Sequence, residues 1–259
     1  MSEMEHLFIS DVHLGAFSKE KETEIEARLI SLINYAINKK AQFYILGDLF
    51  DYWMEYPNSK FIPKVGKAIL DKFEEYNNTV SPAIYVTGNH DNWTFGHFKE
   101  RGFDVETKYR ILSIEGAKVL IMHGDGQIGK RKDFLRPAFH KILRHPSFIE
   151  YYQKIFPPKI GVGIMKKFSN LTRKRNHSNP EPLNNHAQTI LKSSEIDFLF
   201  CGHDHIPRKE TFNNGTYINL GTFFKHGTLV RYINNEFELV TWLDRTKDFV
   251  SYYPIKSTQ

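Results

Sequence analysis

The sequence predicts an α/β fold with layered sheets. Two observations support this prediction. Short apolar runs typical of buried strands alternate with longer segments of helical periodicity, and the runs end in Asp, Asn or His. The chain of 259 residues suits one large domain or one domain with an insertion. With 41% hydrophobic and 25% charged residues, it is neither a disordered chain nor a collagen-like or coiled-coil protein.

The N-terminal half alternates between expected strands and helices. A strand over residues 6–10 ends at Asp11, and Thr23 with Glu26 resembles a capping box that predicts a helix over 23–39. The apolar residues at helical spacing in that segment are Ile25, Leu29, Leu32, Ile33 and Ala36. The further elements expected here are a strand over 43–46, a helix marked by Val65, Ile69, Leu70 and Phe73, and strands over 83–86 and 117–122.

Residues 126–180 interrupt this rhythm and form an expected insertion. After it, residues 183–191 have a helical pattern and residues 197–200 form a strand-like run that leads to Gly202. From Lys209 onward, short strands separated by Asn-rich turns at 213–215 and 234–235 predict a β-rich ending. We therefore predict one core domain formed by residues 1–125 and 181–259, with residues 126–180 inserted into it.

The insertion is strongly basic. Residues 126–180 contain thirteen Lys or Arg and two acids, a net charge of +11, whereas the whole chain carries +5 and the remainder −6. Such asymmetry indicates an anionic partner: a phosphate-bearing ligand, an anionic membrane surface or a nucleic acid. The alternative is a solvated basic face without a partner. Large apolar residues interleaved with the basic ones favour a lipid over a nucleic acid.

The sequence also indicates a compartment. No apolar run approaches the roughly 18–20 residues of a membrane span, and the acidic start Met1 to Glu5 is not typical of a secretory signal. The single cysteine, Cys201, excludes an intramolecular disulfide and fits a reducing environment. We therefore expect a cytoplasmic protein.

Polar clusters follow five of the predicted strands. Because ligand sites in open α/β sheets lie beyond the carboxyl ends of the strands, these clusters can meet in space. Carboxylate, imidazole and amide oxygen are ligands that borderline divalent metals accept, and one Asp can bridge two ions. A lone histidine is more often structural, but five such clusters together predict a metal centre. They are Asp11-Val12-His13, Gly47-Asp48, Gly88-Asn89-His90-Asp91, His123-Gly124-Asp125 and Gly202-His203-Asp204-His205.

In this order the clusters resemble the signature of the calcineurin-like metallophosphoesterases. The resemblance implies a four-layer α/β/β/α sandwich with two metal ions, Mn²⁺ by family resemblance, that generate a hydroxide nucleophile and withdraw charge from phosphoryl oxygens. It also implies that His90 stabilises charge on the phosphate or protonates the leaving oxygen, with Asp91 orienting it and Asp51 as a further partner. Either Asp could instead cap a loop. The ligands implied for one ion are Asp11, His13, Asp48 and His205, and those for the other are Asp48, Asn89, His123 and His203.

Within that superfamily, the chain is most similar to the UDP-2,3-diacylglucosamine diphosphatases of lipid A biosynthesis. The similarity rests on Gly47 to Trp53 and on His123-Gly124-Asp125 followed by Lys132 to Arg136. The insertion lies where that subfamily carries a helical lid. This similarity implies cleavage of a lipid-linked sugar nucleotide to UMP and 2,3-diacylglucosamine 1-phosphate, with peripheral contact to the inner membrane. The expected substrate contacts are Asn89, His90, Lys174, Arg175 and His177.

One departure leaves the substrate open. Many members of that subfamily have Arg where this chain has His90. The alternatives are another nucleotide or lipid-linked phosphodiester, a small soluble phosphate ester, a non-catalytic scaffold of the same fold, and a nuclease. The insertion could also be a small helical subdomain with its own core. The large apolar residues of the insertion argue against a nuclease, and the filled ligand positions argue against a non-catalytic scaffold. We expect no nucleic acid and no obligate protein partner.

Overall fold

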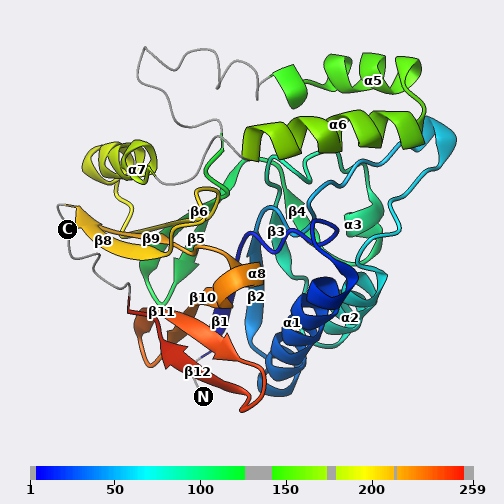
Figure 1. The fold of residues 1–259 in the computed structure, drawn as a ribbon. Coiled ribbons are helices and arrows are strands. Elements are labelled where there is room, and N and C mark those ends of the chain that lie inside the picture. The colour runs from blue at the N-terminus through cyan, green and yellow to red at the C-terminus, as the bar shows by residue number, and fades with distance from the viewer. Residues whose placement is uncertain (1–3, 126–141, 174–178, 213–214, 254–259) are drawn as a thin grey trace.

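Two β-sheets lie face to face at the centre of the protein, and helices cover their outer faces (Figure 1). The structure is a computed structural model that describes residues 4–125, 142–173, 179–212 and 215–253. The predicted α/β class with layered sheets is confirmed. Two parts of the predicted insertion, 126–141 and 174–178, lie outside the described residues.

The larger sheet contains seven strands. They are β1 (His6–Ile9), β2 (Gln42–Leu46), β3 (Ile84–Val86), β4 (Asp104–Glu106), β10 (Thr228–Ile233), β11 (Glu236–Leu243) and β12 (Asp248–Ser251). Their order is β12-β11-β10-β1-β2-β3-β4, with β1 to β4 parallel and β10 to β12 paired antiparallel. Three helices precede or follow these strands: α1 (Lys19–Lys39), α2 (Lys67–Thr79) and α3 (His97–Glu100).

The smaller sheet contains five strands in the order β5-β6-β7-β9-β8. They are β5 (Tyr109–Ile114), β6 (Ala117–Met122), β7 (Phe198–Cys201), β8 (Arg208–Phe212) and β9 (Gly215–Asn219). α7 (Glu181–Ser193) packs on its outer face through Leu183, Ala187 and Leu191. β4 and β5 are additional to the predicted strands. In β5 the apolar Tyr109 and Ile111 are exposed, so no alternation of polarity marks this strand in the sequence.

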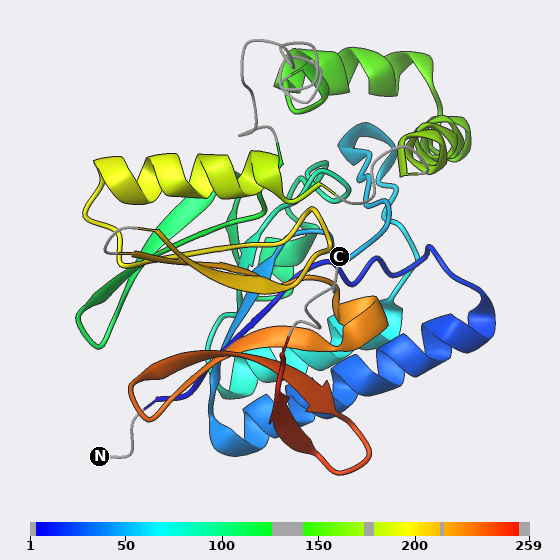
Figure 2. The same cartoon turned by 60° about the vertical axis from the view of Figure 1, so that its left-hand side comes forward.

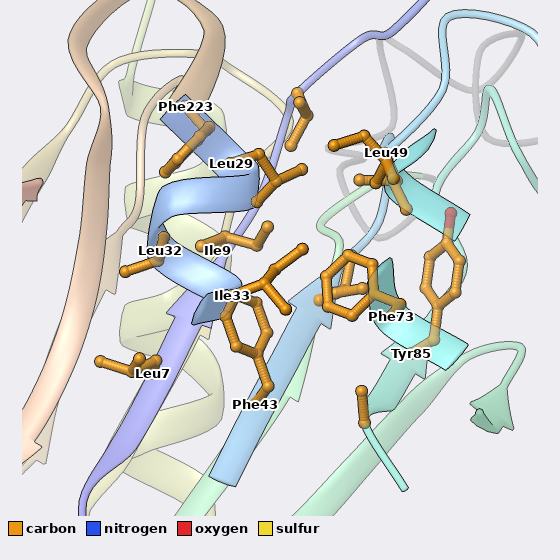
Figure 3. Packing of buried hydrophobic residues seen from close by; sticks show 14 of the residues in the cluster. Leu7, Ile9, Leu29, Leu32, Ile33, Phe43, Leu49, Phe73, Tyr85 and Phe223 are labelled. Atoms are coloured by element: carbon orange, nitrogen blue, oxygen red, sulfur yellow. The ribbon is translucent and has the colours of Figure 1, made fainter. Parts of the chain in front are cut away.

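Three hydrophobic clusters separate the layers. One lies between the two sheets and includes Phe8, Ile121 and Phe200. A second joins the seven-stranded sheet to α1 and α2, where Phe43 and Ile33 meet (Figure 3). The third lies under α7. Figure 2 shows α7, the two sheets and α1 as successive layers. The arrangement is therefore the four-layer α/β/β/α sandwich that the family resemblance implies.

The buried face of α1 is the predicted one, but its start is not. Ile25, Leu29, Leu32, Ile33 and Ala36 are all buried. The prediction of a capping box at Thr23 and Glu26 is wrong, because the helix begins at Lys19 and its N-cap is Ser18. The carboxylate of Glu22 accepts hydrogen bonds from the backbone N–H groups of Gly15 and Phe17, so it satisfies donors of the preceding turn.

The predicted turn at Asn234-Asn235 is confirmed. Both residues have positive φ, 53° and 63°, and they join β10 to β11. A two-residue hairpin with both central residues in the left-handed region is typical of a type I′ turn, which asparagine tolerates well. The hairpin pairs β10 with β11, and the other edge of β10 pairs antiparallel with β1.

The described part of the insertion forms two helices, α5 (Pro146–Ile155) and α6 (Pro158–Arg173). They lie above the loops that follow β2 and β3 (Figure 1). Trp93 donates a hydrogen bond from Nε1 to the carbonyl of Leu143, 2.9 Å away, and Gln153 donates to the carbonyl of Glu55 at 2.7 Å. The apolar contact between helices and loops is formed by Met54, Tyr56, Trp93, Ile149, Tyr152 and Met165. Within the described residues, α5 and α6 therefore pack on loops of the core domain and do not form an apolar cluster of their own.

Two short helices, α8 (Phe223–His226) and a 3-10 turn at Pro57–Ser59, complete the described secondary structure. Across the parts of the chain that the structure covers, no helix has both the length and the apolar character that crossing a membrane requires.

Candidate metal centre

The predicted ligands gather at one edge of the sandwich. Asp11 and His13 follow β1, Asp48 follows β2, and Asn89 follows β3. From the smaller sheet, His123 follows β6, while His203 and His205 follow β7. Since β1, β2 and β3 are parallel, as are β6 and β7, these residues lie at carboxyl ends of strands in both sheets.

The backbone at this edge is unusual. Asp11, His13, Asp48, His203 and His205 all have φ between 51° and 73°, the left-handed region. For a residue other than glycine this conformation costs on the order of 1 kcal/mol, and such costs collect at functional sites. Five of the seven predicted ligands therefore share a backbone conformation that the surrounding structure must impose.

The first group of side chains converges on Asp11. Its Oδ1 lies 3.1 Å from Nε2 of His205 and 3.5 Å from Nε2 of His13. The two Nε2 atoms are themselves 3.1 Å apart. Three potential ligand atoms of two chemical types thus point at one position, as the ligands of one borderline divalent ion would.

The second group converges on His123. Its Nε2 lies 3.1 Å from Oδ1 of Asn89, 3.2 Å from Nδ1 of His203 and 3.3 Å from Oδ2 of Asp48. The same Oδ2 of Asp48 is 3.8 Å from Nε2 of His13 in the first group. Asp48 therefore lies between the two groups, where a bridging carboxylate is expected.

Hydrogen bonds aim the ligand atoms inward. Nδ1 of His123 lies 2.9 Å from the carbonyl of Leu46, so this nitrogen keeps its proton and Nε2 is the nitrogen that faces the centre and can bind an ion once deprotonated. Oδ2 of Asp11 accepts from Oγ of Ser10 at 2.5 Å and from the N–H of His203 at 2.9 Å. Oδ1 of Asp48 accepts from the N–H of His90 at 3.0 Å. In each carboxylate one oxygen holds the loops and the other faces the imidazoles.

Two glycines leave room for these carboxylates. A Cβ atom on Gly88 would overlap Oδ1 of Asp48, and one on Gly202 would overlap Oδ2 of Asp11. Neither position tolerates a side chain without displacing a carboxylate. The glycines that precede the Asn and His residues in the sequence are thus explained by close approach to Asp11 and Asp48.

The charges of the centre favour a cation. Burial lowers the pKa of the His123 imidazole, but Asp48 and Asp11 outweigh it and raise that pKa to about 10. Burial raises the pKa of Asp48, yet His123 and His90 hold it well below its ordinary value. Burial and the neighbouring His123 lower the pKa of His203 to about 3. The carboxylates therefore favour positive charge at His123, whereas His203 stays neutral and can bind an ion through a ring nitrogen; a bound divalent ion would supply the positive charge that the carboxylates attract.

His90 lies beside the centre and is supported by Asp51. Its Nδ1 lies 2.5 Å from the carbonyl oxygen of Asp51 and 3.5 Å from the carboxylate of the same residue. Its Nε2 is 3.9 Å from Oδ2 of Asp48. One ring nitrogen is thus held by the loop after β2 while the other faces the shared carboxylate.

The expected role of Asp91 in orienting His90 is not what the structure shows. The Asp91 carboxylate accepts hydrogen bonds from the N–H groups of Leu49, at 2.8 Å, and Gly88, at 2.7 Å, and from the hydroxyl of Tyr85 at 2.5 Å. Asp91 is fully buried, so these bonds satisfy a carboxylate that has no access to water. It joins the loops after β2 and β3 and acts on the backbone around Asp48 and Asn89, not on the His90 ring.

The structure does not describe the three remaining predicted substrate contacts. Lys174, Arg175 and His177 lie outside the described residues. Two residues that the sequence analysis did not single out belong to the site: Ser10, which bonds to Asp11, and Phe224, whose ring lies 5.8 Å from the rings of both His13 and His205. The position of Ser10 at the end of a strand, next to Asp11, is a signal that could have identified it.

Known proteins are similar to this chain over most of its length. A protein of Wigglesworthia glossinidia brevipalpis named UDP-2,3-diacylglucosamine hydrolase is 26% identical over 265 residues, covering 98% of this chain and 100% of that relative. One of the same name from Coxiella burnetii is 26% identical and covers 90% of this chain and 96% of the relative. Vps29 of Entamoeba histolytica, a solved structure, has a TM-score of 0.46 at 13% identity and covers 96% of this chain and 100% of its own, a likeness too low to add to the assignment.

The family comparison is decisive. The model described as calcineurin-like phosphoesterase matches residues 4–207, a range that contains every residue of the two converging groups. Proteins of this family use a dinuclear metal centre, and here two groups of potential ligands meet at a shared carboxylate. The sandwich, the strand-end ligands and the family match together establish that this chain belongs to the calcineurin-like phosphoesterase family.

Proposed function

We propose that the protein is a two-metal hydrolase that cleaves the pyrophosphate of UDP-2,3-diacylglucosamine, releasing UMP and 2,3-diacylglucosamine 1-phosphate. The observation that carries the reaction type is the position of Asp48, whose Oδ2 lies 3.8 Å from Nε2 of His13 and 3.3 Å from Nε2 of His123. The substrate is supported by the names of the curated relatives, which align over nearly the whole chain.

The donor sets fit two ions such as Mn²⁺. Asp11, His13, Asp48 and His205 would hold one, and Asp48, Asn89, His123 and His203 the other. Ions bound there would lower the pKa of a bound water molecule and withdraw negative charge from phosphoryl oxygens. The mixed carboxylate, imidazole and amide set suits Mn²⁺ while not being restricted to it.

His90 is suited to act on the phosphate. Burial lowers the pKa of its imidazole, but Asp48 and Asp51 outweigh it and raise that pKa to about 9. Without bound ions the ring therefore favours its protonated form at neutral pH, with Nδ1 held against Asp51 and Nε2 toward the centre. Held this way, Nε2–H can donate to a phosphoryl oxygen or give its proton to the leaving oxygen. When protonated, His90 provides the positive charge that arginine provides in many members of the diphosphatase subfamily.

The insertion is suited to a lipid substrate. Residues 126–180 would form a lid whose described helices, α5 and α6, already pack over the loops that follow β2 and β3. These helices expose large apolar side chains: Tyr151 is 67% exposed, Ile155 50% and Ile160 56%. Lys154 and Lys159 lie next to these residues in the sequence. Exposed apolar side chains suit acyl chains and a bilayer surface, although Lys154 is paired with Glu150, and we propose that the enzyme lies peripherally on the membrane that holds its substrate.

The first prediction concerns the shared carboxylate. Asp48→Asn keeps the shape of the side chain but removes the charge between the two groups. We expect kcat/KM for UDP-2,3-diacylglucosamine to fall by more than about 100-fold, beyond the usual loss for residues that only orient ligands. Circular dichroism and Tm should show a folded protein. Asp71→Asn, at a surface ion pair of α2, is the matched control and should keep its activity. Comparable turnover by Asp48→Asn would refute the shared-carboxylate assignment.

Metal binding should release protons. At pH 8 the metal-free His123 imidazole, with its pKa raised to about 10, is protonated and must lose that proton to act as a ligand. The affinity for Mn²⁺ should therefore increase as the pH rises from 6 to 9. Calorimetric titration in two buffers of different ionisation enthalpy should show release of about one proton or more. An identical heat in both buffers would contradict this picture of the centre.

Acyl chains should govern substrate choice. Each buried methylene contributes about 0.8 kcal/mol, so burial of four would favour the acylated substrate roughly 200-fold. We expect kcat/KM for UDP-2,3-diacylglucosamine to exceed that for UDP-glucosamine by at least this ratio. Equal values for the two compounds would leave the reaction type intact but replace this substrate by another nucleotide phosphodiester.

The exposed apolar side chains of α5 should bind lipid. The double variant Tyr151→Ser with Ile155→Ser should partition about tenfold less onto vesicles of phosphatidylethanolamine and phosphatidylglycerol, because each side chain loses apolar burial in the bilayer. Ile111→Ser on β5 is the control, since that residue is 56% exposed and lies outside the insertion. Sedimentation with vesicles measures the effect. Equal partitioning of the double variant and the control would argue against the membrane contact.

A further inference from the structure

We propose that Arg208 is a positioning residue for the metal centre: it holds the loop of His203 and His205 through Asp204 and ties that loop to the start of α7. This inference rests on the metal centre of the proposed function. It concerns a side chain that belongs to neither converging group of ligands.

The contact with Asp204 is a two-point ion pair. Asp204 lies between His203 and His205 in the chain, and its Oδ2 and Oδ1 accept from the two terminal nitrogens of Arg208 at 2.6 and 3.0 Å. Oδ1 also accepts from the N–H of Ile206 at 3.0 Å, which closes the loop locally. A paired guanidinium and carboxylate fixes orientation as well as distance. Arg208 therefore fixes the peptide segment between His203 and His205.

The rest of the guanidinium reaches two other elements. Nε donates to Oδ1 of Asn184 at 2.7 Å, in the first turns of α7, and a terminal nitrogen lies 3.4 Å from the carbonyl of Pro180, the N-cap of that helix. A terminal nitrogen also donates to the hydroxyl of Tyr217, on β9, at 3.1 Å. Arg208 itself is only 6% exposed. One buried cation thus joins the ligand loop, α7 and the smaller sheet.

A second contact supports the other end of the loop. Asn219 is the cross-strand partner of Arg208, and its Nδ2 donates to the carbonyl of Gly202 at 2.8 Å. The hydroxyl of Tyr217 lies within 3.2 Å of the same Nδ2. β8 and β9 therefore hold the loop at Gly202 and at Asp204, on both sides of His203.

The loop requires such support because of its backbone. His203 and His205 have φ of 73° and 64°, a conformation that non-glycine residues keep only when neighbouring groups impose it. The N–H of His203 also donates to the Asp11 carboxylate, so movement of this loop would disturb both groups of ligands. Loss of Arg208 should therefore weaken metal binding without removing any metal ligand.

Lysine cannot replace this arginine. Arg208 uses three nitrogens in a plane to contact five residues, whereas an ammonium group is a single point with three donors. Arg208→Lys should thus keep the positive charge near Asp204 but lose the connection to α7. This distinguishes a positioning role from simple charge compensation.

Calorimetric titration with Mn²⁺ tests the proposal directly. Arg208→Met and Arg208→Lys should each bind Mn²⁺ about tenfold or more weakly than the wild type, the loss usual for groups that orient metal ligands. Arg231→Met is the matched control, because Arg231 lies opposite Leu7 of β1, pairs with Glu5 and contacts Tyr35, all of them away from the metal centre at the carboxyl end of that strand. That variant should lose thermal stability but bind Mn²⁺ as the wild type does.

A double variant separates positioning from stability. Arg208→Met leaves Asp204 buried without its partner, so some loss of Tm is expected. Adding Asp204→Asn removes that uncompensated charge and should restore much of the Tm while Mn²⁺ affinity stays low. Wild-type affinity in Arg208→Met, or affinity that recovers together with Tm in the double variant, would overturn this inference alone. Absence of Mn²⁺ binding by the wild type would instead refute the proposed function, and this inference with it.

Discussion

The attraction between two buried carboxylates and the imidazoles around them is the interaction on which the site depends. Asp11 and Asp48 are almost inaccessible to solvent, and each lies within reach of histidines from both sheets. Burying such charges is costly unless they are paired and hydrogen-bonded. The close glycines, the left-handed backbone and the inward-facing lone pairs all follow from placing these two carboxylates side by side where two sheets end.

The sandwich explains why distant residues can meet this requirement. Parallel strands bring their carboxyl ends to one edge, and the apolar cluster between the sheets fixes the distance between the two sets of loops. Neither sheet alone supplies both groups, because Asp11 and Asp48 come from the larger sheet while His123, His203 and His205 come from the smaller one. The insertion then packs on loops of the larger sheet, so its helices lie close to the same edge (Figure 1).

Charged residues around the centre mainly hold backbone in place. Asp91 binds two N–H groups and a tyrosine hydroxyl, and Asp51 supports His90. Arg208 connects a ligand loop to α7. Each contact fixes a loop whose conformation is unfavourable on its own, so the stability of the fold maintains strain at the site. The same logic places Glu55 under the insertion, where its carboxylate accepts from Nε1 of Trp53 at 2.8 Å and Oγ1 of Thr94 at 2.8 Å.

The amino-acid sequence by itself determined the local features of this protein. Helical periodicity identified the buried face of α1, paired asparagines identified the turn after β10, and five strand-end clusters identified the family. These features depend on neighbours within a few residues, where spacing alone decides which face a side chain occupies. Even here, the start of α1 depended on which nearby polar group was free to cap it, and Ser18 took that place.

Only the tertiary structure decided which partner each side chain of the clusters contacts. The sharing of Asp48, the binding of Asp91 to Tyr85 instead of His90, and the position of Arg208 under the histidine loop all involve partners remote in the chain or in another element. A carboxylate next to a histidine in sequence can point to either side of its loop, and the choice depends on which unsatisfied donors the other strands present. Those donors are fixed by the packing of two sheets, which short-range patterns in the sequence do not encode.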